Sequence, residues 1–480
     1  MQSLQMRQAE KPILASGQER GLSDEVIEQL IREGLRLHQQ GQLAEAERLY
    51  QQLLTIDPQH ADGLHLLGMI AFQTGRDEAA VTLISRAIAI KSNAPSYHSN
   101  LGNVLQSQGK YAAAGACYQR ALLLDPKLAD VYVNLGNIFR EQGDLSSGLI
   151  CYRRALALNP DLAEAAAAES MVLLLQGDFE AGWRSFEQRW ETASYDTPRR
   201  RYPFPRWHGE PISSGRLLLW GEQGIGDEIM FAGLVPDVIR TGSRCILDCD
   251  ARLQPLFARS FPAIEIVAKF LPQADPSSDI VAHLPTGSLP SLFRISMAAF
   301  ANTTSPYLIA DAAKRQQLRT RYYDGRKLIG LAWHTKSPKT GRSRSITLPL
   351  LAPLFAMPGV RWISLQYGDH AELQEQVRTA DAPVLIDPEI DQLSDIDNFA
   401  AQVAAMDLVI TIDNSTAHLA GALGIPTWLL LPFAPDWRWL MTGEDSPWYP
   451  SLRLFRQSEP GGWRTVVEGA KNALANLLSG

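Results

Sequence analysis

Three segments of the chain carry residues whose chemistry suits the binding and transfer of a phosphorylated group. In the first, GEQGIGDE, Gly224 and Gly226 allow a tight turn that brings backbone N–H groups close to a ligand. Asp227 follows directly after these glycines, and a carboxylate at the end of a strand can accept a proton from an attacking hydroxyl. Because aspartate is also a common helix cap, both roles stay open and they are compatible.

A second segment, IDNSTAHLAGALG, places polar residues where a predicted strand passes into a predicted helix. Asp413 ends the strand, and Asn414, Ser415 and Thr416 stand at the start of the helix. A helix N-terminus carries unpaired N–H groups and partial positive charge, so it suits a phosphate. His418, in the first turn, could donate to a phosphate oxygen. A capped helix with a partly buried histidine is the alternative interpretation.

A third segment, WHTKSPKTGRSRSITL, is predicted to be an irregular loop with a high density of positive charge. It follows a predicted strand, and its glycine, proline and serine residues disfavour regular structure. Cations on such a loop can neutralise a leaving diphosphate, although a solvated basic loop has the same composition. The four cations are Lys336, Lys339, Arg342 and Arg344.

Short apolar segments that alternate with helical stretches must position these three segments. This alternation favours parallel sheets covered by helices on both faces, with ligands bound outside the carboxyl ends of the strands. The strands fall into two sets, which predicts two Rossmann-like domains, at residues 216–322 and 323–480. The first set is RLLLW, CILDC, IEIV and DIVAHL, and the second is KLIGLAW, VRWISLQ, DLVITID and TWLLLPF.

Residues 27–196 consist of five repeats of 34 residues. This period, with small residues at fixed positions and a proline near the end of most repeats, is the tetratricopeptide signature, in which each repeat is a pair of helices. Such arrays expose a long groove suited to peptides, so we expect this part to hold another polypeptide. The last repeat is degraded, since Ser170 and Arg189 replace small residues of the pattern. One ladder of glycines is Gly41, Gly75, Gly109, Gly143 and Gly177.

The remaining boundaries follow from changes in composition. Residues 1–26 are polar and are expected to form a leader, whereas residues 197–215, rich in proline and glycine, read as an irregular linker. The predicted fold is therefore multidomain, with an all-α tetratricopeptide superhelix followed by an α/β part of two Rossmann-like domains.

Composition narrows the function classes. The 480 residues carry a net charge of −7, which gives no support for broad nucleic-acid binding. No apolar run is long enough for a signal peptide or a membrane span, so we expect a cytoplasmic protein. The four cysteines lack the spacing of a zinc site, and we expect them to be reduced and to fill core space, with no metal bound.

The segments EQGIGDEIMF, RSRSITL, SLQYGD and DNSTAHLAGALG resemble the glycosyltransferase half of bacterial tetratricopeptide glycosyltransferases. That half is similar to the ADP-heptose:lipopolysaccharide heptosyltransferases, which have the GT-B fold. The resemblance implies a nucleotide-sugar co-substrate without a further cofactor, and a reaction that needs no metal and inverts the anomeric carbon.

The same resemblance implies roles for particular residues. Gly226 and Asp227 match a Gly-Asp pair whose aspartate is the proposed catalytic base. Thr335 and Lys336 approximately match a lysine and hydroxyl groups that bind the donor diphosphate, and Ser345 is a further hydroxyl of that loop.

Two more matches concern the donor and the acceptor. The stretch from Asp413 to His418 resembles an Asp-Thr-Gly-x-x-His motif that grips the sugar nucleotide, with Ser415 where glycine is usual. The phrase Asn-Leu-Gly-Asn, which begins at Asn100 and at Asn134, resembles repeats of eukaryotic protein O-GlcNAc transferase. There the first asparagine lines the groove and binds peptide backbone. An exposed polar helix position is the alternative.

The sequence thus predicts a glycosyltransferase that moves a sugar from a nucleotide-sugar donor to a protein acceptor, such as flagellin or another surface protein, held by the repeats. One alternative is an interaction scaffold whose transferase half is inactive or only binds a nucleotide sugar. Another is a lipopolysaccharide or glycan transferase whose repeats serve assembly.

Overall fold

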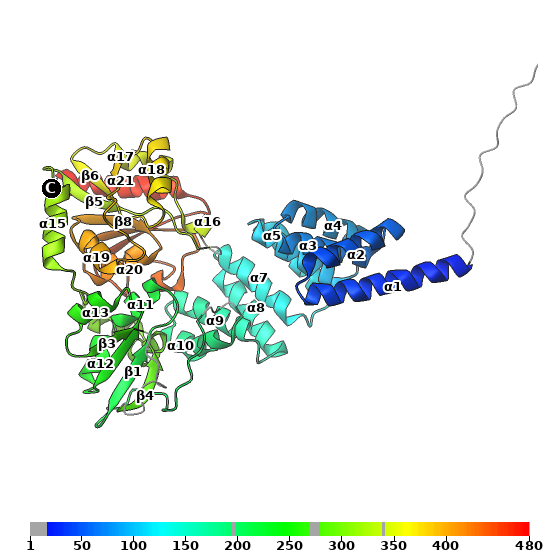
Figure 1. Ribbon diagram of the computed structural model, residues 1–480, viewed down its shortest axis with the longest axis horizontal. Coiled ribbons are helices and arrows are strands. Elements are labelled where there is room, and N and C mark those ends of the chain that lie inside the picture. The colour runs from blue at the N-terminus through cyan, green and yellow to red at the C-terminus, as the bar shows by residue number, and fades with distance from the viewer. Residues whose placement is uncertain (1–16, 194, 196, 269–278, 338–340, 480) are drawn as a thin grey trace, which may run out of the picture. The chain divides into compact units, whose positions relative to one another are not determined.

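The computed structural model describes residues 17–193, 195, 197–268, 279–337 and 341–479 (Figure 1). Residues 1–16 of the predicted leader and Lys339 of the basic loop lie outside this range, and the side chains of residues 17–23 and of Arg342 are not described. The chain divides into two compact units, Met1–Ile138 and Phe139–Gly480.

The first unit consists of helices that pack in consecutive pairs, as the tetratricopeptide pattern predicts. Helix α1 begins at Gly17, inside the segment assigned to the leader, and α7 crosses the limit between the two units. The helices are α1 (Gly17–Gln39), α2 (Leu43–Ile56), α3 (Ala61–Gln73), α4 (Asp77–Ile90), α5 (Pro95–Ser107), α6 (Tyr111–Leu124) and α7 (Ala129–Glu141).

The repeated small residues have two distinct physical roles. Gly41, at the turn between α1 and α2, has a φ of 76°, a left-handed conformation that glycine adopts without steric cost, and its counterparts in the ladder have φ between 75° and 82°. Gly102 instead faces Tyr118, because a Cβ atom there would lie 2.5 Å from the Tyr118 ring. The period therefore records both the turns and the close approach of paired helices.

The second unit begins with the last repeats. Its first elements are α8 (Leu145–Leu158), α9 (Ala163–Leu175), α10 (Phe179–Phe186) and the 3₁₀ helix η1 (Glu187–Glu191). Ser170 is fully buried, and its hydroxyl donates to the carbonyl of Gly182 at 2.8 Å. The departure from glycine at position 170 thus adds a hydrogen bond between α9 and α10.

Two parallel sheets follow, as the sequence predicts. The first has the strand order β3-β2-β1-β4, and Leu218 of its central strand pairs with Ile246 and His283. The strands are β1 (Arg216–Trp220), β2 (Cys245–Cys249), β3 (Glu265–Ala268) and β4 (Ile280–Pro285).

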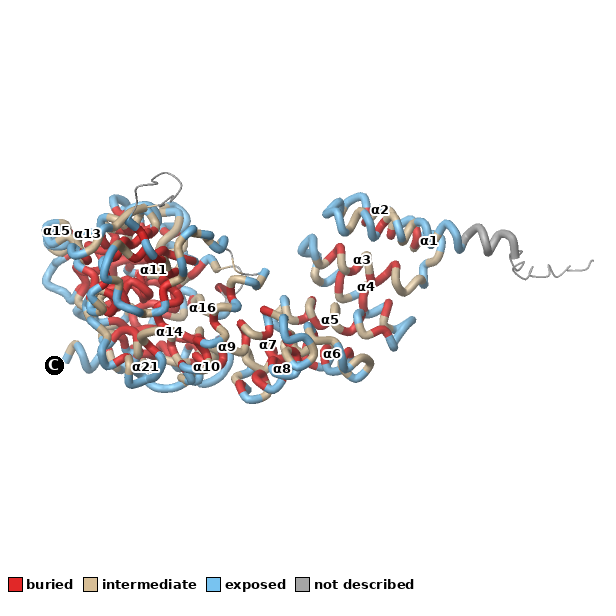
Figure 2. The backbone as a smooth tube through the Cα atoms, turned by 90° about the horizontal axis from the view of Figure 1, so that it is seen from below, coloured by how far each residue is buried: buried red, intermediate tan, exposed pale blue. Residues whose placement is uncertain are grey.

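The second sheet has the order β10-β9-β8-β5-β6-β7. Figure 1 shows α17, α18 and α21 on one side of it and α19 and α20 on the other, and Figure 2 shows many buried residues in the part of the chain that carries α11, α13, α14 and α21. The strands are β5 (Lys327–Leu331), β6 (Val360–Ser364), β7 (Val384–Leu385), β8 (Leu408–Ile412), β9 (Thr427–Leu431) and β10 (Leu452–Arg456).

The helices of these sheets are mostly short. Those near the first sheet are α11 (Ile225–Ala232), α12 (Val235–Arg240), α13 (Gln254–Ser260), η3 (Thr286–Ser288), α14 (Pro290–Phe293) and η4 (Met297–Asn302). Those that follow are α15 (Ala312–Tyr322), α16 (Gly341–Arg344), η5 (Leu348–Leu351), α17 (Ala352–Phe355), α18 (His370–Thr379), α19 (Ile396–Ala404), α20 (Ser415–Ala422), η6 (Trp437–Trp439) and α21 (Trp463–Ser479).

Candidate functional site

The loop after β1 places Asp227 in the first turn of α11. Gly224 precedes the helix, and its N–H faces the Asp227 carboxylate at 3.4 Å, so this side chain helps to cap the helix. The same carboxylate forms an ion pair with Arg438 of η6. Asp227 therefore has the capping contact that the sequence allowed and, in addition, a charged partner that it did not predict.

The first two predicted segments meet at Gly226. A Cβ atom on Gly226 would lie 3.0 Å from Cδ2 of His418 and 3.5 Å from the Cα atom of Ser415. The N-terminus of α11, which follows β1 of the first sheet, therefore lies directly against the first turn of α20, which follows β8 of the second. Asp227 and His418, 191 positions apart in the sequence, are brought to one place.

Asn414 caps helix α20. Its Oδ1 atom accepts hydrogen bonds from the N–H groups of Thr416 at 3.0 Å and Ala417 at 3.3 Å, and the Thr411 hydroxyl donates to the same oxygen at 3.1 Å. The capped-helix interpretation therefore describes this terminus, since two N–H groups that could meet a phosphate are already bound.

His418 is a buried neutral imidazole. Its Nδ1 atom lies 2.9 Å from the Tyr449 hydroxyl, and its ring stacks on Trp439 with centroids 5.1 Å apart. Burial, together with the positive charge of Arg438, lowers the pKa of His418 to about 3. At neutral pH this side chain can form hydrogen bonds but brings no positive charge to the junction.

Five alternating charges run across the same junction and are called the charge chain: Asp413, Arg344, Asp436, Arg438 and Asp227. Arg344 lies 2.9 Å from Asp413 and 3.3 Å from Asp436, and Arg438 lies 2.6 Å from Asp436 before it reaches Asp227. Burial raises the pKa of Asp413, whereas Arg438 and Arg344 overcome the effect of burial on Asp436 and lower its pKa to about 2. The charge chain thus holds two guanidinium groups, those of Arg344 and Arg438, in a mostly buried environment.

Asp436 and Arg438 are site residues that the sequence reasoning did not identify. They follow β9, in PFAPDWRW, just as Asp413 follows β8. The rule that ligands bind beyond the carboxyl ends of parallel strands could have pointed to them. Asp436 caps η6 by accepting from the N–H of Arg438 at 3.2 Å, but the segment contains no glycine-rich loop that marks it as a site.

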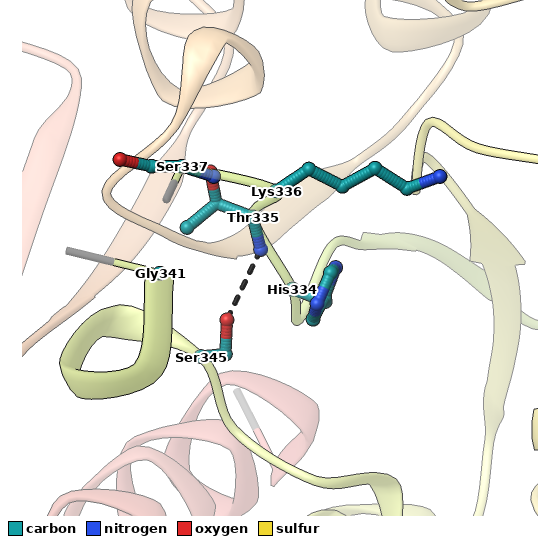
Figure 3. Close-up of a pocket in the computed structure, with 6 residues that line it drawn as sticks. All are labelled: His334, Thr335, Lys336, Ser337, Gly341 and Ser345. Carbon is teal, nitrogen blue, oxygen red and sulfur yellow. Dashed lines mark hydrogen bonds between the residues drawn. The ribbon is translucent and has the colours of Figure 1, made fainter. Parts of the chain in front are cut away.

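The basic loop surrounds a pocket of about 470 Å³ (Figure 3). Its wall includes Thr335, whose N–H donates to the Ser345 hydroxyl at 3.1 Å and whose own hydroxyl accepts from Tyr367 at 2.9 Å. Figure 3 shows the Lys336 side chain extending away from the Thr335–Ser345 hydrogen bond, and its Nζ atom lies 3.9 Å from Glu372. The two cations of this loop whose side chains are described thus lie apart: Arg344 belongs to the charge chain, and Lys336 extends toward Glu372.

Gln366 positions the start of that loop. It is fully buried, and its Oε1 atom accepts from the N–H groups of Trp333 at 2.9 Å and His334 at 2.8 Å. Its Nε2 atom donates to the carbonyls of His334 and Tyr367. The amide therefore ties the ends of β5 and β6 together beneath the pocket.

The predicted groove asparagines lie in the first unit, on α5 and α7. Nδ2 of Asn100 lies 2.8 Å from Nε2 of His65, and Nδ2 of Asn134 donates to Oδ1 of Asn103 at 3.1 Å. Burial lowers the pKa of His65 to about 4, so a neutral ring is available to accept from Asn100. These half-buried side chains link the first helices of neighbouring repeats.

Among the residues that the structure describes, no group of three or more His, Cys, Asp or Glu side chains is arranged to hold a metal ion. No helix in the same part of the chain is both long and apolar enough to cross a bilayer.

Comparison with known proteins identifies the repeats. Models described as TPR repeat and tetratricopeptide repeat match residues 37–102, 102–143 and 129–162. The prediction of tetratricopeptide repeats is therefore confirmed over residues 37–162.

The similarity to one bacterial protein extends further. Protein FlbA of Caulobacter vibrioides is 34% identical over 322 residues, which cover 62% of this chain and 52% of that protein. Human tetratricopeptide repeat protein 7B is 37% identical over 68 residues, 14% of this chain and 8% of that protein. The chain thus spans about half the length of the bacterial relative and a small part of the human one.

Among solved structures, Pseudomonas aeruginosa PilF is 23% identical with a TM-score of 0.33, covering 35% of this chain and 77% of that one. A thermophilic TPR protein of Thermus thermophilus is 19% identical with a TM-score of 0.31, covering 35% of this chain and 93% of that one.

Proposed function

We propose that the chain is a GT-B glycosyltransferase that moves a sugar from a nucleotide-sugar donor to a protein acceptor. The observation that carries the proposal is the junction of α11 and α20, where Asp227, His418 and two arginines of the charge chain come together. A carboxylate, a neutral histidine and paired guanidinium groups beyond the ends of parallel strands suit the transfer of a group from a diphosphate.

In the proposed reaction, Asp227 takes the proton from an acceptor hydroxyl. The hydroxyl oxygen forms a bond to the anomeric carbon as the bond from that carbon to the diphosphate oxygen breaks, with inversion. The nucleoside diphosphate leaves, and Arg344 together with the loop that carries Lys336 stabilises its negative charge. Asp413 and His418 position the donor.

The repeats would present the acceptor, which we propose to be flagellin or another surface protein. Asn100 and Asn134 carry amides that can both donate to and accept from peptide backbone. Their places on equivalent helices of successive repeats support binding of an extended segment with little dependence on its sequence.

Transfer of label from a panel of radiolabelled sugar nucleotides into purified flagellin tests the proposal. We expect Asp227→Asn to lower transfer by about 100-fold or more, the range of general-base catalysis, while the folded state persists. Asp311→Asn is the matched control, because Asp311 caps α15 by accepting from the N–H of Lys314 at 2.9 Å and lies outside both the charge chain and the segments that resemble the glycosyltransferases. Its transfer rate should stay near that of the unaltered chain.

The two alternatives give different results in the same assay. The confirmed repeats favour an interaction scaffold, and near-zero turnover of every donor by both the unaltered chain and Asp227→Asn would support it. Label that enters glycolipid instead of protein, when the chain is incubated with a bacterial lysate, would support a glycan or lipopolysaccharide transferase.

A further inference from the structure

Arg438 is shared between two carboxylates. One of its terminal nitrogens pairs with Asp227, and the other lies 2.6 Å from Asp436. Its guanidinium carbon lies 4.5 Å from the centre of the Trp437 ring, and its buried Nε atom has no hydrogen-bond partner. The group is thus held by one partner on its own element and by one on α11.

Arg438 takes up one lone-pair position of the Asp227 carboxylate and lies beside it, so it competes with an acceptor hydroxyl for that oxygen. The ion pair between Arg438 and Asp227 therefore opposes the proposed role of Asp227 as the base that accepts the hydroxyl proton. A diphosphate would compete with this ion pair, because it offers more negative charge than a single carboxylate and matches the planar fork of a guanidinium.

Two other sets of hydrogen-bond donors near the junction already have partners, so a diphosphate would need a further cation such as Arg438. The Asn414 side chain already binds the N–H groups of Thr416 and Ala417, and Lys336 extends toward Glu372. Arg344 and Arg438 are the two guanidinium groups of the charge chain, and both contact Asp436. Asp436 thus holds the pair side by side with one carboxylate.

We propose that Arg438 is a diphosphate-binding residue of the donor site, and that it leaves Asp227 for the diphosphate when the donor binds. The base then becomes available when the leaving group is in place. This inference rests on the proposed function and extends it, because it names the cation that binds the diphosphate and couples donor binding to release of the base.

The test measures binding of nucleoside diphosphates by isothermal titration calorimetry, using UDP, GDP, CDP and ADP as probes of the full chain. Arg438→Ala should raise the Kd of the tightest-binding nucleoside diphosphate by about ten-fold or more. Arg438→Lys, which keeps the charge but not the planar fork of the guanidinium, should raise it by less. Asp227→Asn should lower the Kd of the same nucleoside diphosphate by about five-fold, because Arg438 then no longer has to leave a carboxylate. Arg378→Ala, an exposed arginine of α18, is the control and should bind as the unaltered chain does.

The tightening in Asp227→Asn separates this role from a purely structural one. If the ion pair were only structural, its loss in Asp227→Asn would leave the affinity for the nucleoside diphosphate unchanged or lower. That result would overturn this inference but not the proposed function. In the double variant Asp227→Asn with Arg438→Ala the tightening should disappear, and its persistence would overturn the inference as well. If none of the four probes binds the unaltered chain, the proposed donor site is wrong and this inference falls with it.

Discussion

Arg189→Met tests how the last repeat is joined to the loop that carries Asp227. The Nη2 atom of Arg189 lies 2.9 and 3.1 Å from the two carboxylate oxygens of Glu222 and 3.1 Å from the Ser288 hydroxyl. Both Arg189 and Glu222 are only 2% exposed. Burial raises the pKa of Glu222, and Arg189 opposes that rise, so removal of the guanidinium leaves a buried carboxyl without its charged partner.

Breaking a buried ion pair from one side costs about 3–5 kcal/mol of unfolding free energy. The unit Phe139–Gly480 has roughly 340 residues. At about 2.1 cal/mol/K of unfolding entropy per residue, that cost lowers its Tm by about 4–7 °C. Differential scanning calorimetry measures the shift, and chemical denaturation gives the free energy.

Arg184→Met is the matched control. Arg184 lies on α10, its side chain is 74% exposed, and its distance to Glu180 is 3.6 Å, so we expect a cost within about 0.5 kcal/mol. The double variant Arg189→Met with Glu222→Gln should recover part of the loss, because no buried charge remains unpaired. Equal shifts for Arg189→Met and Arg184→Met would refute the argument that the buried pair joins these elements.

Two further predictions concern the same loop. Burial raises the pKa of Glu228 to about 7 in the folded state, so the free energy of unfolding should fall as pH rises from about 4.5 to 7. Glu228→Gln should not show this fall, and above pH 7 its free energy of unfolding should exceed that of the unaltered chain by up to about 3 kcal/mol. Chemical denaturation of both proteins at pH 5 and pH 8 measures the difference. A gap that does not grow with pH would contradict this. Gly226→Ala should destabilise the second unit by about 1 kcal/mol, because its Cβ would press on His418, which Tyr449 and Trp439 hold in place. Gly224→Ala, whose Cβ would approach nothing closer than 3.9 Å, serves as control, and equal stability of the two alanine variants in thermal denaturation would count against the packing argument.

Elements with a strong local signal could be predicted from the sequence. The strand predicted at DLVITID is β8, Leu408–Ile412, and all five of its residues are buried. Strand β10 was missed because LRLFR lies at the edge of its sheet and mixes apolar with charged residues, with Arg453 exposed. The two-residue strand β7 is too short to produce a periodic pattern.

The hydrogen-bond partners of the residues that depart from the repeat pattern could not be predicted from the sequence. In the sequence, Ser170 and Arg189 indicate a degraded terminal repeat. In the structure each makes buried hydrogen bonds, Ser170 to the backbone of α10 and Arg189 to Glu222. A residue type shows that a pattern is broken, whereas its new partner lies on a different element and depends on the tertiary contacts.

The sequence by itself determined the helix pairs of the repeats and the central strands of both parallel sheets, because residue period, left-handed glycines and buried apolar runs act over a few neighbouring positions. It also indicated Asp227 and His418 as candidates for one site. Only the tertiary structure decided that Gly226 lies against His418, that Asn414 occupies the N–H groups of α20, and that Arg438 pairs with Asp227. These contacts join positions far apart in the chain, and no local preference specifies which partner a charged side chain will meet.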